Sequence, residues 1–324
     1  MKKKNLLTLA SAALCAIVSA SCSNASVTAF SANWYANTTI GNIVEGTSET
    51  LTYSVTMKEE PAAGKPAAYY TDGKYTTTLS TEIRDGEQVY SYQTALDISV
   101  QFMVDGETSE KFKDSITSKV VFKNTQTGLQ PVRSEKRVYS HSPSSIAPKK
   151  LEDFCRLYQY GVEIEYKENC TKATSVYTDY SKSEPIVNSK DFSISDKYSY
   201  LDNEQILFAL RGVSFASSHQ LQRNNSTSTG TSTQLFKATP SAAESEEFEF
   251  EMNGTSAKRA IQYYPVALVL SDKNPGSTQT AWYAATTNNT SNTYRNVLLK
   301  LEAPLYYNLG TLVYTLKTAN FASA

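Results

Sequence analysis

Hydrophobic and polar residues alternate along most of this chain, and the alternation has a period of two. Leu51, Tyr53, Val55 and Met57 are separated by threonine and serine, and residues 97–104 repeat the pattern before an Asp-Gly pair. A period of two places every second side chain on the same face, as in a half-buried β-strand. The pattern therefore predicts long antiparallel strands that each have one polar face.

The same alternation recurs from the first quarter of the chain to its end, and it predicts an all-β fold built as one or two curved sheets or open half-barrels. Segment 140–148, SHSPSSIAP, contains two prolines and divides an N-terminal β region, 22–140, from a C-terminal β region, 149–324. Further strands are expected near 75–83, 116–122, 132–138, 162–166, 172–179, 190–199, 248–252, 264–270, 278–285, 296–301 and 312–316.

One segment, about 202–211, has the period of a helix instead. Asp202 is a good N-cap residue, Gly212 is a stop signal, and the apolar residues between them fall on one face. We expect this helix to pack on the concave face of a sheet.

Residues 223–245, RNNSTSTGTSTQLFKATPSAAES, contain few apolar side chains. Burial of so few apolar groups does not offset the conformational entropy lost on ordering. The composition predicts a long mobile loop, in which 234–236 are the best candidates for a short strand.

The first 21 residues have the organisation of an export signal. Three lysines precede an apolar stretch, Leu6 to Val18, and small residues then lead to Cys22. This ending resembles the lipobox of bacterial lipoproteins, which implies a lipid on Cys22 and an anchor at the cell envelope or cell surface. Plain secretory cleavage after Ala20 or Ala25 is the alternative. The apolar stretch is shorter than the ~20 residues that a membrane-spanning helix requires.

Cys155 and Cys170 remain once the signal and the lipid site account for the other two cysteines. An oxidising compartment favours a disulfide between them, either at the open end of a hairpin turning near Gly161 or between neighbouring strands. A zinc site is the alternative, but two cysteines without a nearby histidine form a poor ligand set.

Charge and motifs narrow the function classes. The formal net charge of −1 for 324 residues provides no basic face for nucleic acid, so no nucleic-acid partner is expected. The sequence lacks a phosphate-binding loop, a dinucleotide fingerprint, an EF-hand and an H-E-x-x-H motif, and we expect no cofactor or metal. His141 and His219 fall in polar segments without a nucleophile elbow, so no catalytic residue is assigned.

Aromatic residues are the remaining candidates for a binding surface. The chain contains 22 tyrosines, and several stand in adjacent pairs, so that one ring of each pair points away from the core of a strand. We select Trp34, Trp282, Tyr264 and Tyr307 as ligand-face candidates. Cross-strand packing is the alternative role for these rings.

A resemblance of pattern adds to this interpretation. The strand, turn and proline-led strand over 112–138, and again over 295–316, resemble the meander of envelope half-barrel proteins of the lipoprotein-carrier type. That resemblance implies an open barrel around an apolar cavity with a helix as its lid. We therefore predict non-catalytic binding of a hydrophobic or lipid-like ligand. A surface carbohydrate-binding or glycan-processing protein is the first alternative, and a structural or adhesion subunit is the second.

Overall fold

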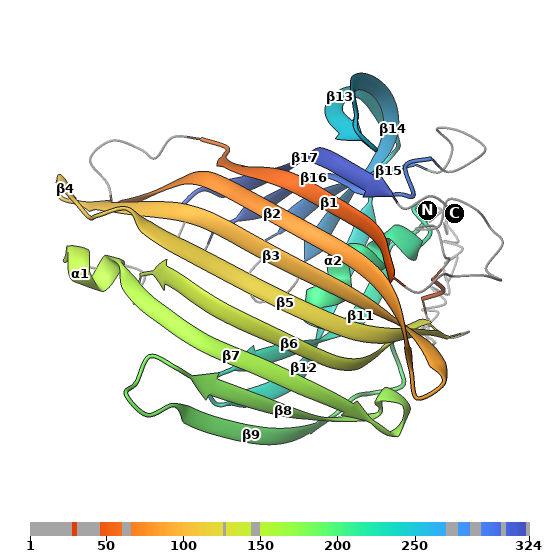
Figure 1. Ribbon diagram of the computed structural model, residues 1–324, viewed down its shortest axis with the longest axis horizontal. Helices are drawn as coiled ribbons and strands as arrows, with labels where there is room; N and C mark the ends of the chain where they lie inside the picture. The colour runs from red at the N-terminus through yellow and green to blue at the C-terminus, as the bar shows by residue number, and fades with distance from the viewer. Residues whose placement is uncertain are drawn as a thin grey trace, which may run out of the picture.

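The chain folds as a continuous, strongly curved β-sheet, seen in a computed structural model (Figure 1). The structure describes residues 28–30, 46–59, 66–125, 128–143, 150–269, 278–285, 293–305 and 309–321. Its strands are β1 (Gly46–Met57), β2 (Ala67–Arg84), β3 (Glu87–Val104), β4 (Glu107–Thr108), β5 (Phe112–Thr125), β6 (Gly128–Ser142), β7 (Arg156–Lys167), β8 (Lys172–Asp179), β9 (Ile186–Ser193), β10 (Tyr200–Leu201), β11 (His219–Thr227), β12 (Gly230–Pro240), β13 (Glu244–Met252), β14 (Thr255–Val269), β15 (Gln279–Ala284), β16 (Leu298–Pro304) and β17 (Thr311–Phe321).

Antiparallel pairing runs from β9 through β8, β7, β6, β5, β3, β2 and β1 to β17, and onward through β16 and β15 to β14. Beyond β14 the wall divides, because β14 pairs with β12 along one half and with β13 along the other. A short parallel pairing of Glu251 with Thr318 joins β13 to β17 and closes the strands β13 to β17 into a ring of five. The predicted all-β class is confirmed.

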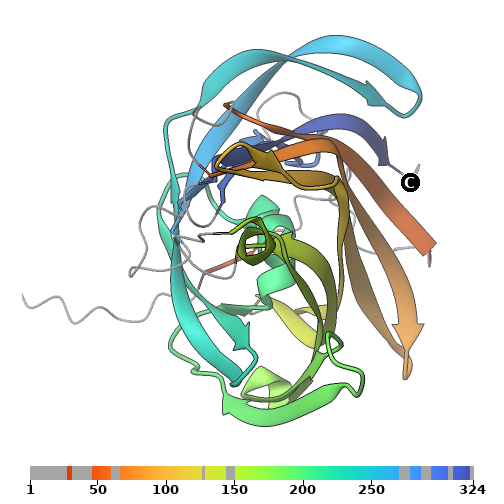
Figure 2. The same cartoon turned by 90° about the vertical axis from the view of Figure 1, so that its left-hand side faces the viewer.

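The predicted helix lies inside the curve of the sheet (Figure 2). It consists of η2 (Asn203–Gln205), α2 (Ile206–Ala209) and η3 (Leu210–Gly212), and the side chains of Asp202 and Gln205 form a capping box at its start. Ile206, Phe208, Ala209 and Leu210 are at most 4% exposed and pack against strands from both halves of the chain. The predicted helix, its cap and its place on the concave face are confirmed.

Tight turns set the register of the hairpins. Asp105 and Gly106 both have positive φ, 50° and 86°, and Asn253 and Gly254 have 49° and 81°. Two consecutive residues with positive φ form a type I′ turn, whose twist matches that of the two paired strands. The Asp-Gly and Asn-Gly signals therefore mark real hairpins, β3–β4 and β13–β14.

The mobile loop predicted over 223–245 is wrong. β11 and β12 form a regular hairpin from the His219–Ala238 pair to the Thr227–Gly230 pair, and β13 begins at Glu244. Threonine has high strand propensity, and Leu221, Phe236 and Ala238 provide a sparse apolar face that is at most 2% exposed. Sheet pairing satisfies the polar backbone there, which the composition of the segment does not reveal.

The predicted disulfide is also wrong, because Cys155 and Cys170 are both free thiols at opposite ends of β7. Cys155 follows an unpredicted short helix, α1 (Leu151–Phe154), whereas Cys170 ends the turn η1 (Glu168–Cys170). At about 3.3 Å per residue, the twelve residues of β7 hold them far beyond the ~7 Å that a disulfide spans. Gly161 is not a turn and lies in the middle of that strand.

The sheet continues across the segment proposed as a boundary. β6 pairs with β7 from Arg133 and Glu165 to Ser142 and Arg156, and β1 pairs with β17 near the other end of the chain. Residues 144–148 of that segment lie outside the described residues. The two β regions thus share one hydrogen-bonded wall.

Candidate functional site

The concave side of the wall is only partly filled, and a cavity of about 260 Å³ remains beside the helix. This interior cavity is bounded by side chains from β2, β3, β6, the helix, β15, β16 and β17, so strands from both ends of the sequence contribute to it. Its lining residues are Tyr75, Thr94, Lys136, Asn203, Glu204, Ile206, Leu207, Gln279, Leu301, Ala303 and Tyr314.

An ion pair marks one side of the interior cavity. The Nζ of Lys136 lies 2.9 Å from Oε1 of Glu204, and their side chains are 27% and 18% exposed. Lys136 lies on the concave face of the wall, because it pairs with Ser118, whose hydroxyl bonds Thr94 on the cavity wall, and Glu204 lines the same cavity from the helix. Their exposed surface therefore faces the cavity.

The two charges stabilise each other. Burial disfavours both charged forms, but the ion pair outweighs it, so that the pKa of Lys136 is raised and the pKa of Glu204 is lowered. Asn203 donates a further hydrogen bond of 2.9 Å to the same carboxylate oxygen. The site therefore holds a fixed dipole at neutral pH.

Aromatic and aliphatic side chains form the opposite side. The rings of Tyr75 and Tyr314 meet edge to face with centroids 5.4 Å apart, and both rings are only partly buried. Burial raises the pKa of Tyr314 to about 12, so its phenol is neutral at physiological pH. Leu301 and Leu207 extend this apolar surface toward the helix. The interior cavity is amphipathic, with rings on one side and an ion pair on the other.

A buried polar network holds the start of the helix beside this cavity. Oδ2 of Asp202 accepts hydrogen bonds from the hydroxyls of Ser134 and Tyr166, each at 2.5 Å, and Tyr166 also contacts the hydroxyl of Tyr200 at 3.1 Å. Burial raises the pKa of Asp202 above its ordinary value, although these hydrogen bonds oppose the shift. The network fixes β6, β7 and β10 to the helix cap.

The far end of the helix is held by a second ion pair. Arg211 donates two hydrogen bonds to the carboxylate of Glu49, 2.6 and 2.9 Å long, and two more to the carbonyl oxygen of Arg295. The Arg211 and Glu49 side chains are 3% and 1% exposed. This pair joins the helix to β1 and is enclosed by protein.

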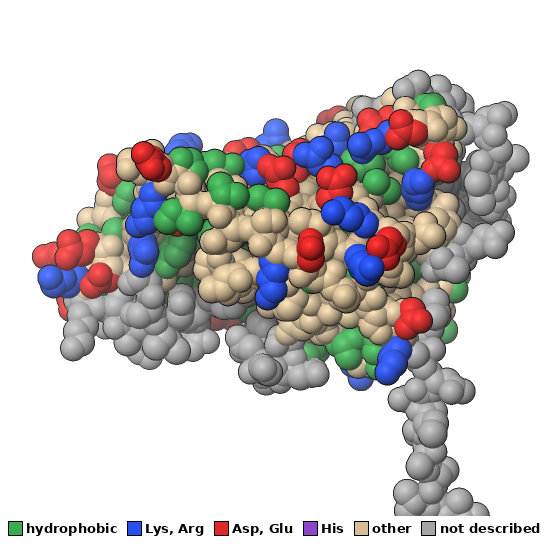
Figure 3. All heavy atoms as spheres, turned by 90° about the horizontal axis from the view of Figure 1, so that it is seen from below, with side chains coloured by type: hydrophobic (Ala, Val, Ile, Leu, Met, Phe, Trp, Pro, Cys, Tyr) green, Lys and Arg blue, Asp and Glu red, His purple; other side chains and the backbone are tan. Residues whose placement is uncertain are grey.

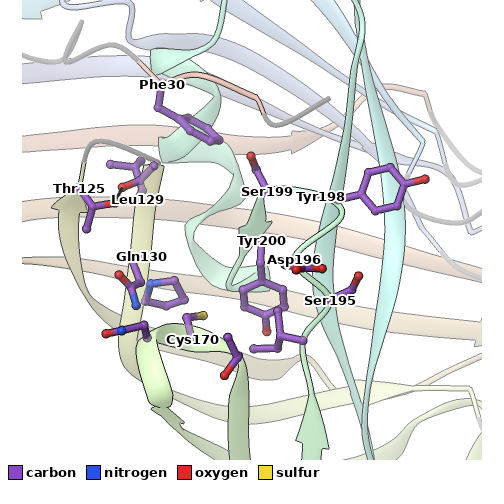
Figure 4. Close-up of a pocket in the computed structure, with 15 residues that line it drawn as sticks. Phe30, Thr125, Leu129, Gln130, Cys170, Ser195, Asp196, Tyr198, Ser199 and Tyr200 are labelled. Atoms are coloured by element: carbon purple, nitrogen blue, oxygen red, sulfur yellow. Dashed lines mark hydrogen bonds between the residues drawn. The ribbon is translucent and has the colours of Figure 1, made fainter. Parts of the chain in front are cut away.

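A separate cleft of about 300 Å³ opens at the end of the barrel near the described N-terminal residues (Figure 4). We call it the end cleft. It is lined by Phe30, Thr125, Gly128, Leu129, Gln130, Pro131, Asn169, Cys170, Thr171, Ile194, Ser195, Asp196, Tyr198, Ser199 and Tyr200. Tyr200 connects it to the buried network around Asp202.

Neither of the two predicted aromatics that the structure describes lines the interior cavity. Tyr264 pairs with Tyr283 and stacks on Phe215 at 4.9 Å, whereas Trp282 lies on the other face of the β14–β15 ladder under the Nζ of Lys300 at 4.6 Å. Packing accounts for both rings. The other candidates, Cys22, Trp34 and Tyr307, lie outside the described residues.

Sequence analysis missed Lys136 and Glu204, although one signal for Lys136 was present. Lys136 lies on the same face of its strand as Ser134 and Val138, which are both buried. The alternation of residues therefore places a charged side chain on the inner face. Its partner is 68 residues away in the helix. Only the tertiary structure identifies that partner.

The two histidines have structural surroundings. His141 is 7% exposed, lies on Phe112, and bonds Asp114 through Nδ1 at 2.7 Å, so it is a buried strand residue and not part of a loop. His219 bonds the carbonyl oxygen of Ser214 at 2.7 Å on the surface. Among the described residues, neither ring is hydrogen-bonded to a serine, threonine or cysteine side chain that it could activate as a nucleophile.

Within the described ranges, no group of three or more histidine, cysteine, aspartate or glutamate side chains is arranged to hold a metal ion. Among those same residues, no helix has the length and apolar character needed to cross a membrane. Seen from below, the surface is mostly polar with both signs of charge interspersed (Figure 3).

The sequence matches no protein-family model and no curated protein. Among solved structures, the chain is similar to a β-barrel-like protein from Brucella abortus, from a domain family of unknown function, DUF1849. The two share 9% sequence identity with a TM-score of 0.49, over 87% of this chain and 100% of that chain. A similarity of this size carries no information about function.

Proposed function

We propose that this protein is a non-catalytic binding protein that holds a small hydrophobic or lipid-like molecule in its interior cavity. The observation that carries the proposal is the partial exposure of Tyr75, Tyr314, Lys136 and Glu204 inside a curved wall. A filled core would bury the rings, and a purely structural ion pair would be enclosed as Arg211 and Glu49 are. Small-molecule sites typically combine an apolar surface with a few fixed polar groups.

The arrangement favours a ligand with two unlike ends. An apolar part would displace water from Tyr75, Tyr314 and Leu301, while a polar head would meet the ion pair of Lys136 and Glu204. The volume of about 260 Å³ is just below the roughly 300–1,000 Å³ of common ligand sites, so it suits a short chain or a single ring system.

We further propose that the protein is exported and anchored by a lipid on Cys22. Support comes from the three lysines, the apolar stretch and the small residues before Cys22 in the sequence. Mass spectrometry of the mature N-terminus tests this proposal. A diacylglyceryl-modified Cys22 supports it, and an unmodified cysteine or a later start contradicts it.

Ligand binding is tested by native mass spectrometry and by thermal shift with a panel of short-chain fatty acids, the corresponding fatty alcohols and single-ring aromatic alcohols. Ala303→Phe fills the interior cavity from β16, and Ala95→Phe makes the same change in a shallow groove on the opposite face of β3. We expect a ligand adduct that is lost in Ala303→Phe and kept in Ala95→Phe. An empty protein with no shift across the panel, or equal loss in both variants, contradicts the proposal.

A further inference from the structure

We propose that the end cleft is a second binding site, independent of the interior cavity, and that it takes a neutral sugar. The proposal rests on three properties of the lining: ring surfaces, amide and carboxylate groups without partners in the described structure, and the lack of a cationic side chain. Together these are the chemistry that recognises a polyhydroxylated ring without a charge.

Ring surfaces lie on two sides of the end cleft. Figure 4 shows Phe30 at the top of the cleft and Tyr200 below it, across from Leu129 and Gln130. The Tyr200 ring is oriented because its hydroxyl bonds that of Tyr166, and Phe30 is positioned by the hydrogen bonds between Thr28 and Ser199. Aromatic faces of this kind pack against the C–H surface of a sugar ring.

Several polar groups of the end cleft are available to a ligand. Most of its hydroxyls are engaged, since Thr125, Thr171 and Ser199 bond backbone groups. In contrast, the side chains of Gln130, Asn169 and Asp196 have no hydrogen-bond partner among the described residues. Two amides and a carboxylate provide both donors and acceptors, which matches the alternating donor and acceptor character of sugar hydroxyls.

The charge of the lining selects against anions. Its fifteen described residues include no lysine, arginine or histidine, and Asp196 is its one carboxylate. Burial raises the pKa of the Cys170 thiol to about 12, so that this group is neutral as well. A phosphate or carboxylate would meet Asp196 without a counter-charge, whereas a neutral sugar would not.

The end cleft is separate from the interior cavity. The two have no lining residue in common, and the hydrogen-bonded groups of Tyr166 and Asp202 lie between Tyr200 and the helix. Its volume of about 300 Å³ is at the lower end of common ligand sites, which suits one or two rings. Sugar binding here therefore does not depend on the ligand proposed for the interior.

Saturation-transfer NMR with the full mature protein tests this site. The neutral probes are cellobiose, maltose and diacetylchitobiose, and glucose 6-phosphate is the charged probe. Gln130→Leu removes one of the two amides of the end cleft, and Gln279→Leu makes the same change in the interior cavity. We expect transfer to at least one neutral sugar and not to glucose 6-phosphate, with affinity about fivefold or more weaker in Gln130→Leu and unchanged in Gln279→Leu.

Phe30→Leu is the second variant, and it should also weaken binding of the same sugar while the melting temperature stays close to that of the wild type. The proposal is overturned if none of the neutral probes shows transfer, if glucose 6-phosphate binds as well as they do, or if Gln130→Leu and Phe30→Leu leave the affinity unchanged. Weaker sugar binding in Gln279→Leu would show that the sugar binds in the interior cavity, and this result would also overturn the proposal. None of these results alters the test of the interior cavity with lipid-like probes.

Discussion

The two ends of the interior helix carry ion pairs that differ in how far they are exposed. At its C-terminal end, Arg211 and Glu49 are joined by two hydrogen bonds and are at most 3% exposed. At its N-terminal end, Lys136 and Glu204 share one contact of 2.9 Å and keep 27% and 18% of their side-chain surface. One pair is enclosed by protein, and the other faces a cavity.

This difference distinguishes an ion pair that stabilises the fold from one that is available to a ligand. An enclosed bidentate pair is costly to break, because removal of one partner leaves a buried charge. A pair beside a cavity can exchange part of its surroundings with water or a ligand at much lower cost. We therefore assign the C-terminal pair to the fold and the N-terminal pair to the site.

The largest effect should come from Arg211→Met. This change leaves the Glu49 carboxylate buried and unpaired, so we expect the free energy of unfolding to fall by about 3–5 kcal/mol. Urea unfolding followed by circular dichroism measures it. A loss below about 1 kcal/mol would show that this end of the helix does not hold the fold.

Lys136→Met should have a smaller effect on stability, about 1–3 kcal/mol, because cavity water can solvate Glu204 and Asn203 still donates to it. The double variant Lys136→Met/Glu204→Leu removes both charges and should recover most of that stability. Titration of a fatty acid and of the corresponding hydrocarbon separates the roles. We expect the double variant to bind the hydrocarbon as the wild type does but to lose its preference for the fatty acid. An unchanged preference would contradict a role of the ion pair in binding the polar head.

Asp202→Asn should change how stability depends on pH. Burial raises the pKa of Asp202 above its ordinary 3.8, so the folded state binds this proton more tightly than the unfolded chain. Its contribution is therefore complete below pH 3.8 and is lost as the pH rises through the raised value. Asparagine does not titrate, and it can keep the cap.

Over that pH window, Asp202→Asn should gain stability relative to the wild type, by roughly 1.4 kcal/mol for each unit of pKa shift. Unfolding by urea at a series of pH values measures the difference. Parallel stability curves for the two proteins would mean that the carboxyl group titrates alike in both states.

Glu163→Gln should have the smallest effect. Glu163 bonds Arg137 at 2.7 Å and lies 3.5 Å from Arg133, but all three side chains are more than 40% exposed. Surface ion pairs contribute about 0–1 kcal/mol, and salt screens them. A loss above ~2 kcal/mol, which exceeds the usual range for surface pairs, or a loss that persists at high salt, would show that this pair stabilises the fold.

Local patterns predicted much of this fold. The alternation over 51–57 and 97–104 became β1 and β3, and Asp202 caps the helix as its position indicated. These features depend on neighbours in sequence, such as the parity of a strand or the first turn of a helix. They could be predicted from the sequence because burial of one face gives the apolar residues of a strand or helix a regular spacing.

Features set by distant contacts were not readable. The polar segment 223–245 is ordered by pairing with β10, β14 and its own hairpin, and Cys155 and Cys170 are separated by the full length of β7. The site depends on Lys136 meeting Glu204 inside a curved wall. Neither composition nor spacing encodes the curvature that brings them together.

The most direct test of the central claim uses methyl NMR with a spin-labelled fatty acid. We predict that this probe broadens the methyl signals of Ile206, Leu207 and Leu301, which line the interior cavity, more strongly than those of Val297 and Leu316 in the packed core. Broadening confined to exposed residues such as Ile186 and Val187, or none at any methyl, would contradict it.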